Sequence, residues 1–114
     1  MTEILMQETL ITAKEYNLKL IYGLERFVDS IENEQLNEAL QLLSEIIEGM
    51  EWLIQATNLT DEIQKEKLDV NELNQNLVAM TEALENQDYM LLTDIVNYEI
   101  IAKLQNWHQL NFSN

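Results

Sequence analysis

Cysteine and proline are absent from this 114-residue chain, and glycine occurs only twice. Without cysteine the chain has no disulfide framework, no thiolate chemistry and no cysteine-ligated metal site. Without proline, and with so little glycine, it has few residues suited to hairpin turns or long structured loops. Apolar residues recur at intervals of three and four, which predicts helices. We therefore expect an all-α chain that forms a single helical-bundle domain over residues 1–114.

Basic residues are also scarce, because six lysines and arginines accompany 21 aspartates and glutamates, giving a net charge of −15. Nucleic acids and anionic membranes are bound through lysine and arginine, so we expect neither as a partner. No apolar run approaches the ~20 residues that span a bilayer, and the N-terminus lacks the basic stretch of a signal peptide. We expect a cytoplasmic protein whose negative charge maintains solubility or attracts a basic protein.

The spacing of the apolar residues predicts four helices. They run from Thr2 to Ile31 or Asn33, and over about residues 34–57, 61–85 and 88–108, with a frayed tail at 111–114. The third segment is weak before Leu68, so a break at 67–69 is an alternative, with Asp69 capping the second piece. Short turns between neighbouring helices predict an antiparallel four-helix bundle built from two helical hairpins.

A faint internal repeat supports this plan. A shift of 53 residues superimposes the apolar positions of the two hairpins and places Glu32-Asn33 over Glu85-Asn86. Any two helical hairpins share their apolar spacing, so the argument for a repeat depends on the common turn.

The first predicted helix is apolar on two opposite sides. One side is a seam with Asn17 as its polar member, and it comprises Met6, Leu10, Ala13, Leu20, Leu24, Phe27 and Ile31. At about 100° per residue, Ile4, Ile11, Leu18 and Tyr22 fall about 180° from that seam. A surface helix of a small protein needs one apolar stripe. The second stripe therefore predicts packing on both sides, or a face reserved for another chain.

Two aromatic residues are further candidates for a binding surface. Met50 belongs to the apolar seam of the second helix, which Leu40, Ile47 and Ile54 widen. At 100° per residue, Trp52 lies about 160° from Met50 around that helix. Tyr98 lies on a last helix that is apolar nearly all round, with Glu99 and Lys103 as its main polar strip. Such aromatics belong either to the core or to an exposed patch that recruits another chain. The predicted partner-binding residues are Ile4, Ile11, Leu18, Tyr22, Trp52 and Tyr98.

Three small or polar residues within helices also require explanation. Asn17 is either a buried amide that fixes register or a half-exposed residue at the bundle edge. Gly23 and Gly49 each cost roughly 1 kcal/mol relative to alanine inside a helix. We expect another helix or an aromatic ring to approach closely at these glycines.

No arrangement of residues predicts catalysis. The single histidine, His108, has no glutamate three residues before it, as a metal site in a bundle would require. Glu45, Glu48 and Glu51 recur every three residues, which indicates a solvated helix face. There is no glycine-rich phosphate loop and no nucleophile with a base. We expect no enzymatic activity, no metal and no cofactor.

Residues 42–53 and 83–89 resemble segments of small acidic helical-bundle proteins of Gram-positive bacteria, a resemblance that implies a fold without a function. Residues 20–33, 36–43 and 100–107 more weakly resemble the flagellar secretion chaperone that binds flagellin. That second resemblance implies a helical module that binds another protein.

We expect a non-enzymatic adaptor, or an export-chaperone-like module, that docks an amphipathic helix of a partner protein on the stripe of Ile4, Ile11, Leu18 and Tyr22. An acidic rim would favour a partner with basic residues. One alternative is a self-assembling homodimer that uses the same stripe as its interface. Another is an acidic mimic of nucleic acid.

Overall fold

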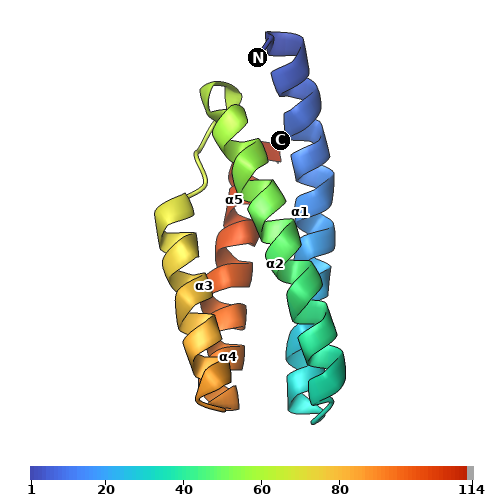
Figure 1. Cartoon of the computed structure of the whole chain (residues 1–114). Coiled ribbons are helices and arrows are strands. Elements are labelled where there is room, and N and C mark those ends of the chain that lie inside the picture. The colour runs from blue at the N-terminus through green and yellow to red at the C-terminus, as the bar shows by residue number, and fades with distance from the viewer. Residues whose placement is uncertain (113–114) are drawn as a thin grey trace.

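The computed structural model describes residues 1–112, and every regular element among them is helical, as predicted (Figure 1). The first hairpin consists of α1 (Glu3–Glu32) and α2 (Leu36–Leu59). A 3-10 turn, η1 (Asp61–Ile63), and an extended stretch lead to α3 (Val70–Glu85). The C-terminal helix is one rod made of α4 (Tyr89–Ile95), the π-helical segment η2 (Val96–Ile101) and α5 (Ala102–Phe112).

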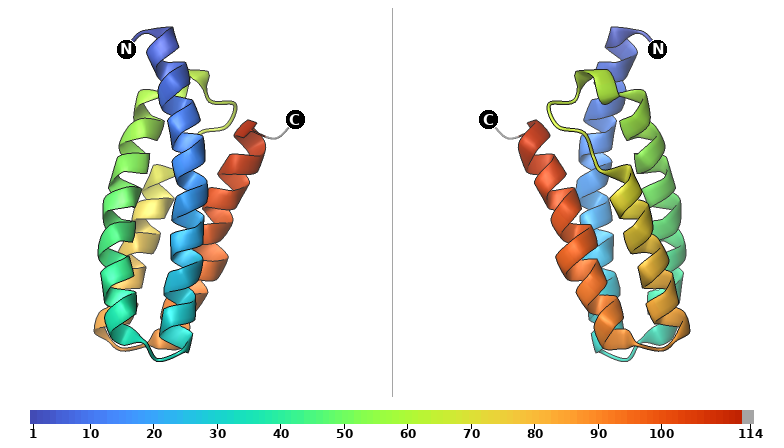
Figure 2. Two further views of the ribbon diagram at one scale, coloured as in Figure 1. Left: turned by 90° about the vertical axis from the view of Figure 1, so that its right-hand side faces the viewer. Right: turned by 90° about the vertical axis from the view of Figure 1, so that its left-hand side faces the viewer.

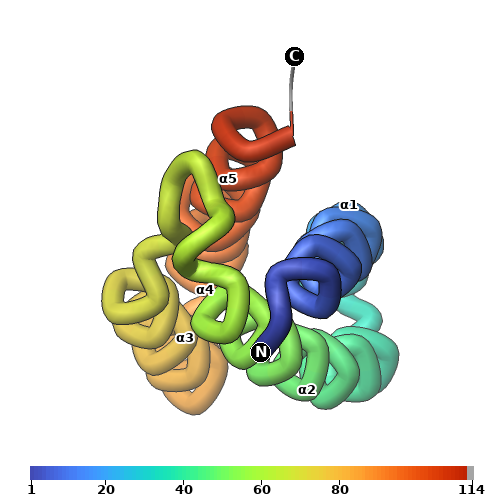
Figure 3. The backbone as a smooth tube through the Cα atoms, turned by 90° about the horizontal axis from the view of Figure 1, so that it is seen from above, coloured from blue at the N-terminus to red at the C-terminus, as the bar shows by residue number. Residues whose placement is uncertain are grey.

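The four rods form two antiparallel hairpins, which confirms the predicted four-helix bundle. Both hairpin turns lie at one end, whereas the N-terminus, the link between the hairpins and the end of α5 lie at the other (Figure 1). One view in Figure 2 shows α1 between α2 and the C-terminal helix, and the opposite view shows α3 between the same two neighbours. Seen from above, α1 and α3 therefore occupy opposite corners of the bundle (Figure 3).

The two hairpin turns have the same hydrogen-bond pattern. Asn33 and Asn86 end their helices with the backbone N–H donating to the carbonyl four residues earlier, at 2.9 and 3.0 Å. The next residues, Glu34 and Gln87, adopt positive φ angles of 59° and 57°. This left-handed conformation at the end of a helix lets the chain reverse direction. The shared turn predicted by the repeat is confirmed.

The core lies between the two hairpins and receives large side chains from all four rods. Fully buried examples are Leu24, Phe27, Met50, Leu53, Leu73, Met80, Leu92, Ile100 and Leu104. The predicted seam of α1 is confirmed from Ala13 onward. Its first members, Met6 and Leu10, are only partly buried, because the start of α1 projects beyond the other helices (Figure 1).

Asn17 is completely buried in the core. Its Nδ2 donates to the backbone carbonyl of Leu104 at 3.1 Å, while its Oδ1 has no hydrogen-bond partner within residues 1–112. An unpaired buried acceptor is costly, so the amide limits how α1 can slide along α5. Of the two interpretations made from the sequence, the buried amide is the right one.

The two glycines have different neighbours. A Cβ added to Gly49 would lie 2.5 Å from Tyr16 Oη, so an aromatic ring occupies that space, as predicted. A Cβ added to Gly23 would lie 3.9 Å from Ile46 Cγ1 on the adjacent helix, which is an ordinary contact. Only Gly49 is therefore required by packing.

The third predicted helix is too long by about two turns. Residues 64–69 are not helical, and α3 begins at Val70 with the Asp69 carboxylate accepting from the N–H of Glu72 at 3.0 Å. The predicted Asp69 cap is confirmed, but the break starts earlier than 67–69. Between Ile63 and Leu68 the sequence has no apolar side chain that could anchor a helix to the core.

Two side chains of the C-terminal helix hold this link instead. Trp107 Nε1 donates to Gln64 Oε1 at 3.0 Å, and Asn111 bonds both the N–H and the carbonyl of Glu66, at 3.2 and 2.9 Å. Asn111 is buried and Phe112 is helical. The predicted fraying of these two residues is wrong, and the last two residues of the predicted tail lie outside the described part of the chain.

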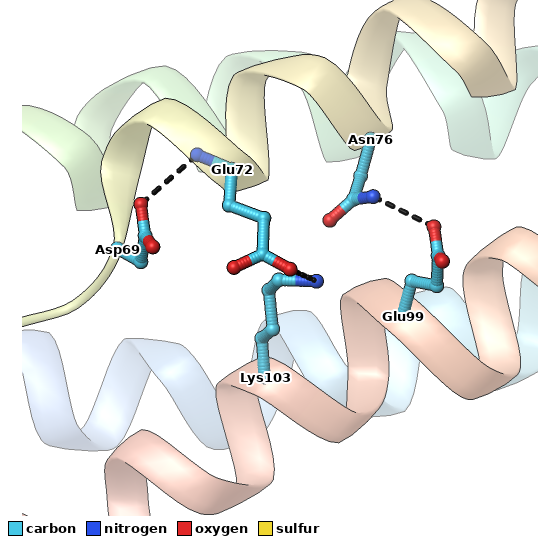
Figure 4. Close-up of polar contacts among 5 residues, drawn as sticks. All are labelled: Asp69, Glu72, Asn76, Glu99 and Lys103. Atoms are coloured by element: carbon cyan, nitrogen blue, oxygen red, sulfur yellow. Dashed lines mark hydrogen bonds and ion pairs between the residues drawn. The ribbon is translucent and has the colours of Figure 1, made fainter.

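Polar contacts join α3 to the C-terminal helix (Figure 4). Lys103 Nζ lies 3.0 Å from Glu72 Oε1, and Asn76 Nδ2 donates to Glu99 Oε2 at 2.7 Å. Glu99 and Lys103, predicted as the main polar strip of the last helix, both contact polar residues of α3. The C-terminal helix uses this side to pack against its hairpin partner.

Candidate protein-binding surfaces

The second apolar stripe of α1 is uncovered. We call Ile4, Ile11, Leu18 and Tyr22 the outer face of α1; their side chains are between 49% and 69% exposed. The seam on the opposite side of the helix contacts both α2 and the C-terminal helix (Figure 2). The fold of one chain therefore leaves the outer face to solvent or to another molecule.

Charged residues of both signs border this face. Glu8 and Glu15 are exposed on one flank, and so are Lys19 and Arg26. Arg26 lies 3.6 Å from Glu38, but both side chains are nearly half exposed, so this ion pair contributes little. The charges of α1 are mixed, since the helix carries three of the chain's six basic residues and six of its 21 acidic ones.

Trp52 and Tyr98 lie in different places. Trp52 is 38% exposed and packs edge-on against Tyr16 of α1, with ring centroids 5.1 Å apart. It therefore lies beside α1 and adds apolar surface at its border with α2. Tyr98 is 75% exposed and lines a shallow hollow with Leu91 and Asp94 on the C-terminal helix. The structure does not bring Tyr98 to the outer face of α1.

An apolar groove between α2 and α3, not anticipated from the sequence, has a volume of about 430 Å³. Its lining residues are Ile47, Leu77, Val78, Met80, Thr81, Glu82 and Glu85. On the same side of α2 as Ile47, a strip at helical spacing also includes Leu36, Leu40, Leu43 and Ile54, of which Leu43 and Ile54 are partly buried against the core. The sequence assigned part of this strip to the core; the structure leaves Leu40 and Ile47 exposed.

The two charged residues that line this groove, Glu82 and Glu85, are both acidic. The two helices carry seven glutamates and no lysine or arginine: Glu38, Glu45, Glu48, Glu51, Glu72, Glu82 and Glu85. Within residues 1–112 only Glu38 and Glu72 have a cationic partner. The groove thus combines apolar side chains with unpaired carboxylates, unlike the mixed rim of α1.

Other chemistry receives little support from the geometry. His108 is partly buried and packs against the ring of Phe112, at 5.4 Å between centroids. Glu45, Glu48 and Glu51 are exposed, as expected for a solvated face. Among residues 1–112 no three histidine, aspartate or glutamate side chains converge as a metal site requires. In the same range, no helix has the length and apolar character needed to cross a membrane.

The family model described as "Domain of unknown function (DUF8042)" matches residues 8–110. This range contains α2, α3, the link and nearly all of α1 and the C-terminal helix. No curated protein and no solved structure matches the chain. Because the match covers most of its length, the chain belongs to this domain family of unknown function.

Proposed function

We propose that this protein is a non-enzymatic adaptor, comparable to an export chaperone, that holds an amphipathic helix of another protein in the groove between α2 and α3. One observation carries the proposal: exposed apolar side chains line a groove whose two helices bear only negative charge. The sequence led us to expect a basic partner, and the α2–α3 groove suits such a partner better than the outer face of α1. We expect the adaptor in the cytoplasm.

The size of the apolar strip supports a helical ligand. From Leu36 to Ile54 it extends for about 27 Å at 1.5 Å per residue, which matches about five turns of a docked helix. Helices that bind in grooves insert side chains spaced by three and four residues. Their burial contributes ~25 cal/mol per Å² before the costs of association.

The carboxylates support a ligand with lysine or arginine on its flanks. Glu82 and Glu85 line the groove, and Glu48 and Glu51 are exposed on α2. Complementary charge of this kind mainly accelerates encounter and excludes acidic competitors. The expected ligand is therefore apolar on one face and basic at its borders.

A binding experiment with synthetic peptides tests this function. The probe is a labelled 20-residue amphipathic helix with leucines on one face and lysines on both flanks, measured by fluorescence anisotropy. Changing Ile47→Gln together with Val78→Gln removes apolar contacts without changing charge, and should weaken binding at least 10-fold. The control is Met90→Gln with Leu110→Gln, since these two exposed residues lie outside the groove.

Two outcomes would contradict the proposal. One is equal binding by the groove variant and its control. The other is equal binding of a peptide whose lysines are replaced by glutamates. Acidic mimicry of nucleic acid, the competing hypothesis, depends on carboxylates alone. It predicts that the groove variant binds the lysine peptide normally and that added salt abolishes binding.

A further inference from the structure

We infer that the outer face of α1 binds a second copy of this chain, with the two α1 helices packed antiparallel about a twofold axis near Asn17. This inference concerns a different surface from the adaptor groove. It rests on the order of charges beside the outer face and on the exposure of its apolar residues.

Four charged residues form one flank of the outer face. At about 100° per residue, this flank is a sector of about 40° next to Ile11 and Leu18. It contains Glu8, Glu15, Lys19 and Arg26. All four are exposed. Read from the N-terminus, the flank has two negative charges followed by two positive charges.

When two copies of this flank run antiparallel, the negative charges of each copy face the positive charges of the other. A twofold axis perpendicular to two antiparallel helices brings the same flank of each copy together with opposite direction. Glu8 then lies opposite Arg26 of the second copy, and Glu15 lies opposite Lys19. Both pairs have their midpoint at residue 17, so a single axis satisfies both, and each pair occurs twice. In a parallel arrangement the twofold axis runs along the helices and places this flank beside the opposite flank of the second copy, so neither pair forms.

The apolar residues agree with the same axis. A midpoint near residue 17 places Ile11 opposite Tyr22 of the second copy and Leu18 close to Leu18 of the second copy. These side chains are about half exposed or more in one chain. Trp52, which Tyr16 holds beside the face, extends the apolar area toward α2. The interface would therefore have an apolar centre and a charged border, as stable interfaces do.

The location of the basic residues makes the outer face of α1 a better surface for self-association than α2 or α3. Two chains of net charge −15 repel each other. The outer face of α1 is bordered by Lys14, Lys19 and Arg26, half of all basic residues, whereas α2 and α3 have none. Opposite views of the bundle show α1 and α3 (Figure 2), so a dimer through α1 leaves the α2–α3 groove accessible on each copy.

Sedimentation equilibrium on the full chain tests the inference. The unmodified protein should be a dimer at concentrations of tens of micromolar, and Leu18→Glu should be monomeric with unchanged helical circular dichroism. Lys19→Glu should weaken the dimer at least 10-fold, because Glu15 of the second copy then opposes a glutamate. The double variant Glu15→Lys with Lys19→Glu exchanges the charges and should restore the affinity to within threefold.

A matched control separates local pairing from general repulsion. Lys65→Glu changes the net charge as much as Lys19→Glu but lies in the exposed link, so it should leave the dimer nearly unchanged. A monomeric unmodified protein would overturn the inference, as would a charge-exchanged variant that is no better than Lys19→Glu. Peptide binding by the Leu18→Glu monomer reports on the groove separately, so failure of the dimer does not imply failure of the adaptor.

Discussion

At the scale of single residues, the two glycines have different neighbours in the structure, although both lie within helices. Gly49 makes room for the ring of Tyr16, which in turn packs on Trp52. A Cβ atom at Gly23 would make only an ordinary van der Waals contact with Ile46. Its cost to helix stability is therefore not offset by packing.

We predict that Gly23→Ala raises the free energy of unfolding by about 1 kcal/mol, because alanine is the better helix former and fits the space. Gly49→Ala should give no gain or a loss, since Tyr16 must move away from the added methyl group. Urea unfolding followed by circular dichroism measures both. A stabilised Gly49→Ala variant would show that the Tyr16 ring is not confined as described.

Asn17 shows what a residue pattern can and cannot reveal. Its position in an apolar seam predicted a special role, and burial confirms it. The sequence did not indicate its partner, because the Leu104 carbonyl is a backbone group 87 residues away. Side chains that bond to distant backbone leave no signature in the spacing of residue types.

At the scale of elements, the link between the hairpins depends on the C-terminal helix. Asn111 replaces the backbone hydrogen bonds that residues near Glu66 would make in a helix. Trp107 adds a bond to Gln64, whose Nε2 also donates to the carbonyl of Thr57 at 2.8 Å. The extended link is thus ordered by side chains far along the chain.

We predict that Asn111→Ala lowers the free energy of unfolding by about 1–3 kcal/mol, because two backbone groups of Glu66 lose their partner. Trypsin should then cut faster after Lys65 and Lys67, the two basic residues in the link. Limited proteolysis with mass spectrometry detects these cuts. Gln105→Ala, at an exposed position of the same helix, is the control. Equal cutting rates in both variants would contradict the role of Asn111.

The helices, their turns and the seam of α1 could be predicted because each depends on neighbours three or four residues apart. The link could not, since it is held by Trp107 and Asn111. The π-helical segment η2 was also missed; it lets both Ile100 and Ile101 enter the core. No residue type marks such an insertion in an otherwise regular helix.

The binding surfaces were predicted in part for a similar reason. The second apolar stripe of α1 followed from geometry within one helix, whereas its exposure was one of two alternatives. The α2–α3 groove depends on the distance between two helices, which the sequence does not reveal. The position of Ile47 in the apolar pattern of α2 is the same whether another helix covers it or not. Tyr98 was chosen because the last helix is apolar nearly all round, and the structure places it away from the outer face of α1.

At the scale of the whole molecule, acidic residues outnumber basic ones in each of α1, α2 and α3. The helices α2 and α3 and the turns carry many carboxylates with few cationic partners within residues 1–112. Repulsion among them opposes the compact state. The two ion pairs in the described chain are partly exposed and compensate little.

We predict that sodium chloride stabilises the fold. Raising the concentration from about 0.01 to 0.2 M shortens the Debye length to below about 10 Å and screens repulsion between carboxylates. The melting temperature of Leu18→Glu, which removes any effect of dimerisation, should rise by several degrees. Potassium chloride at equal concentration should raise the melting temperature by the same amount, because screening depends on ionic strength and not on the cation. A fall in the melting temperature would mean that attractive ion pairs outweigh the repulsion.

The placement of the chain ends has a consequence for how the polypeptide can be reordered. The start of α1, the end of α5 and the link all lie at one end of the bundle, opposite the two equivalent turns (Figure 1). A gene that encodes residues 69–112 before residues 2–59 would therefore preserve both reversals and every α-helix. Such a permuted polypeptide would need only a new connector at the end where the original one is removed.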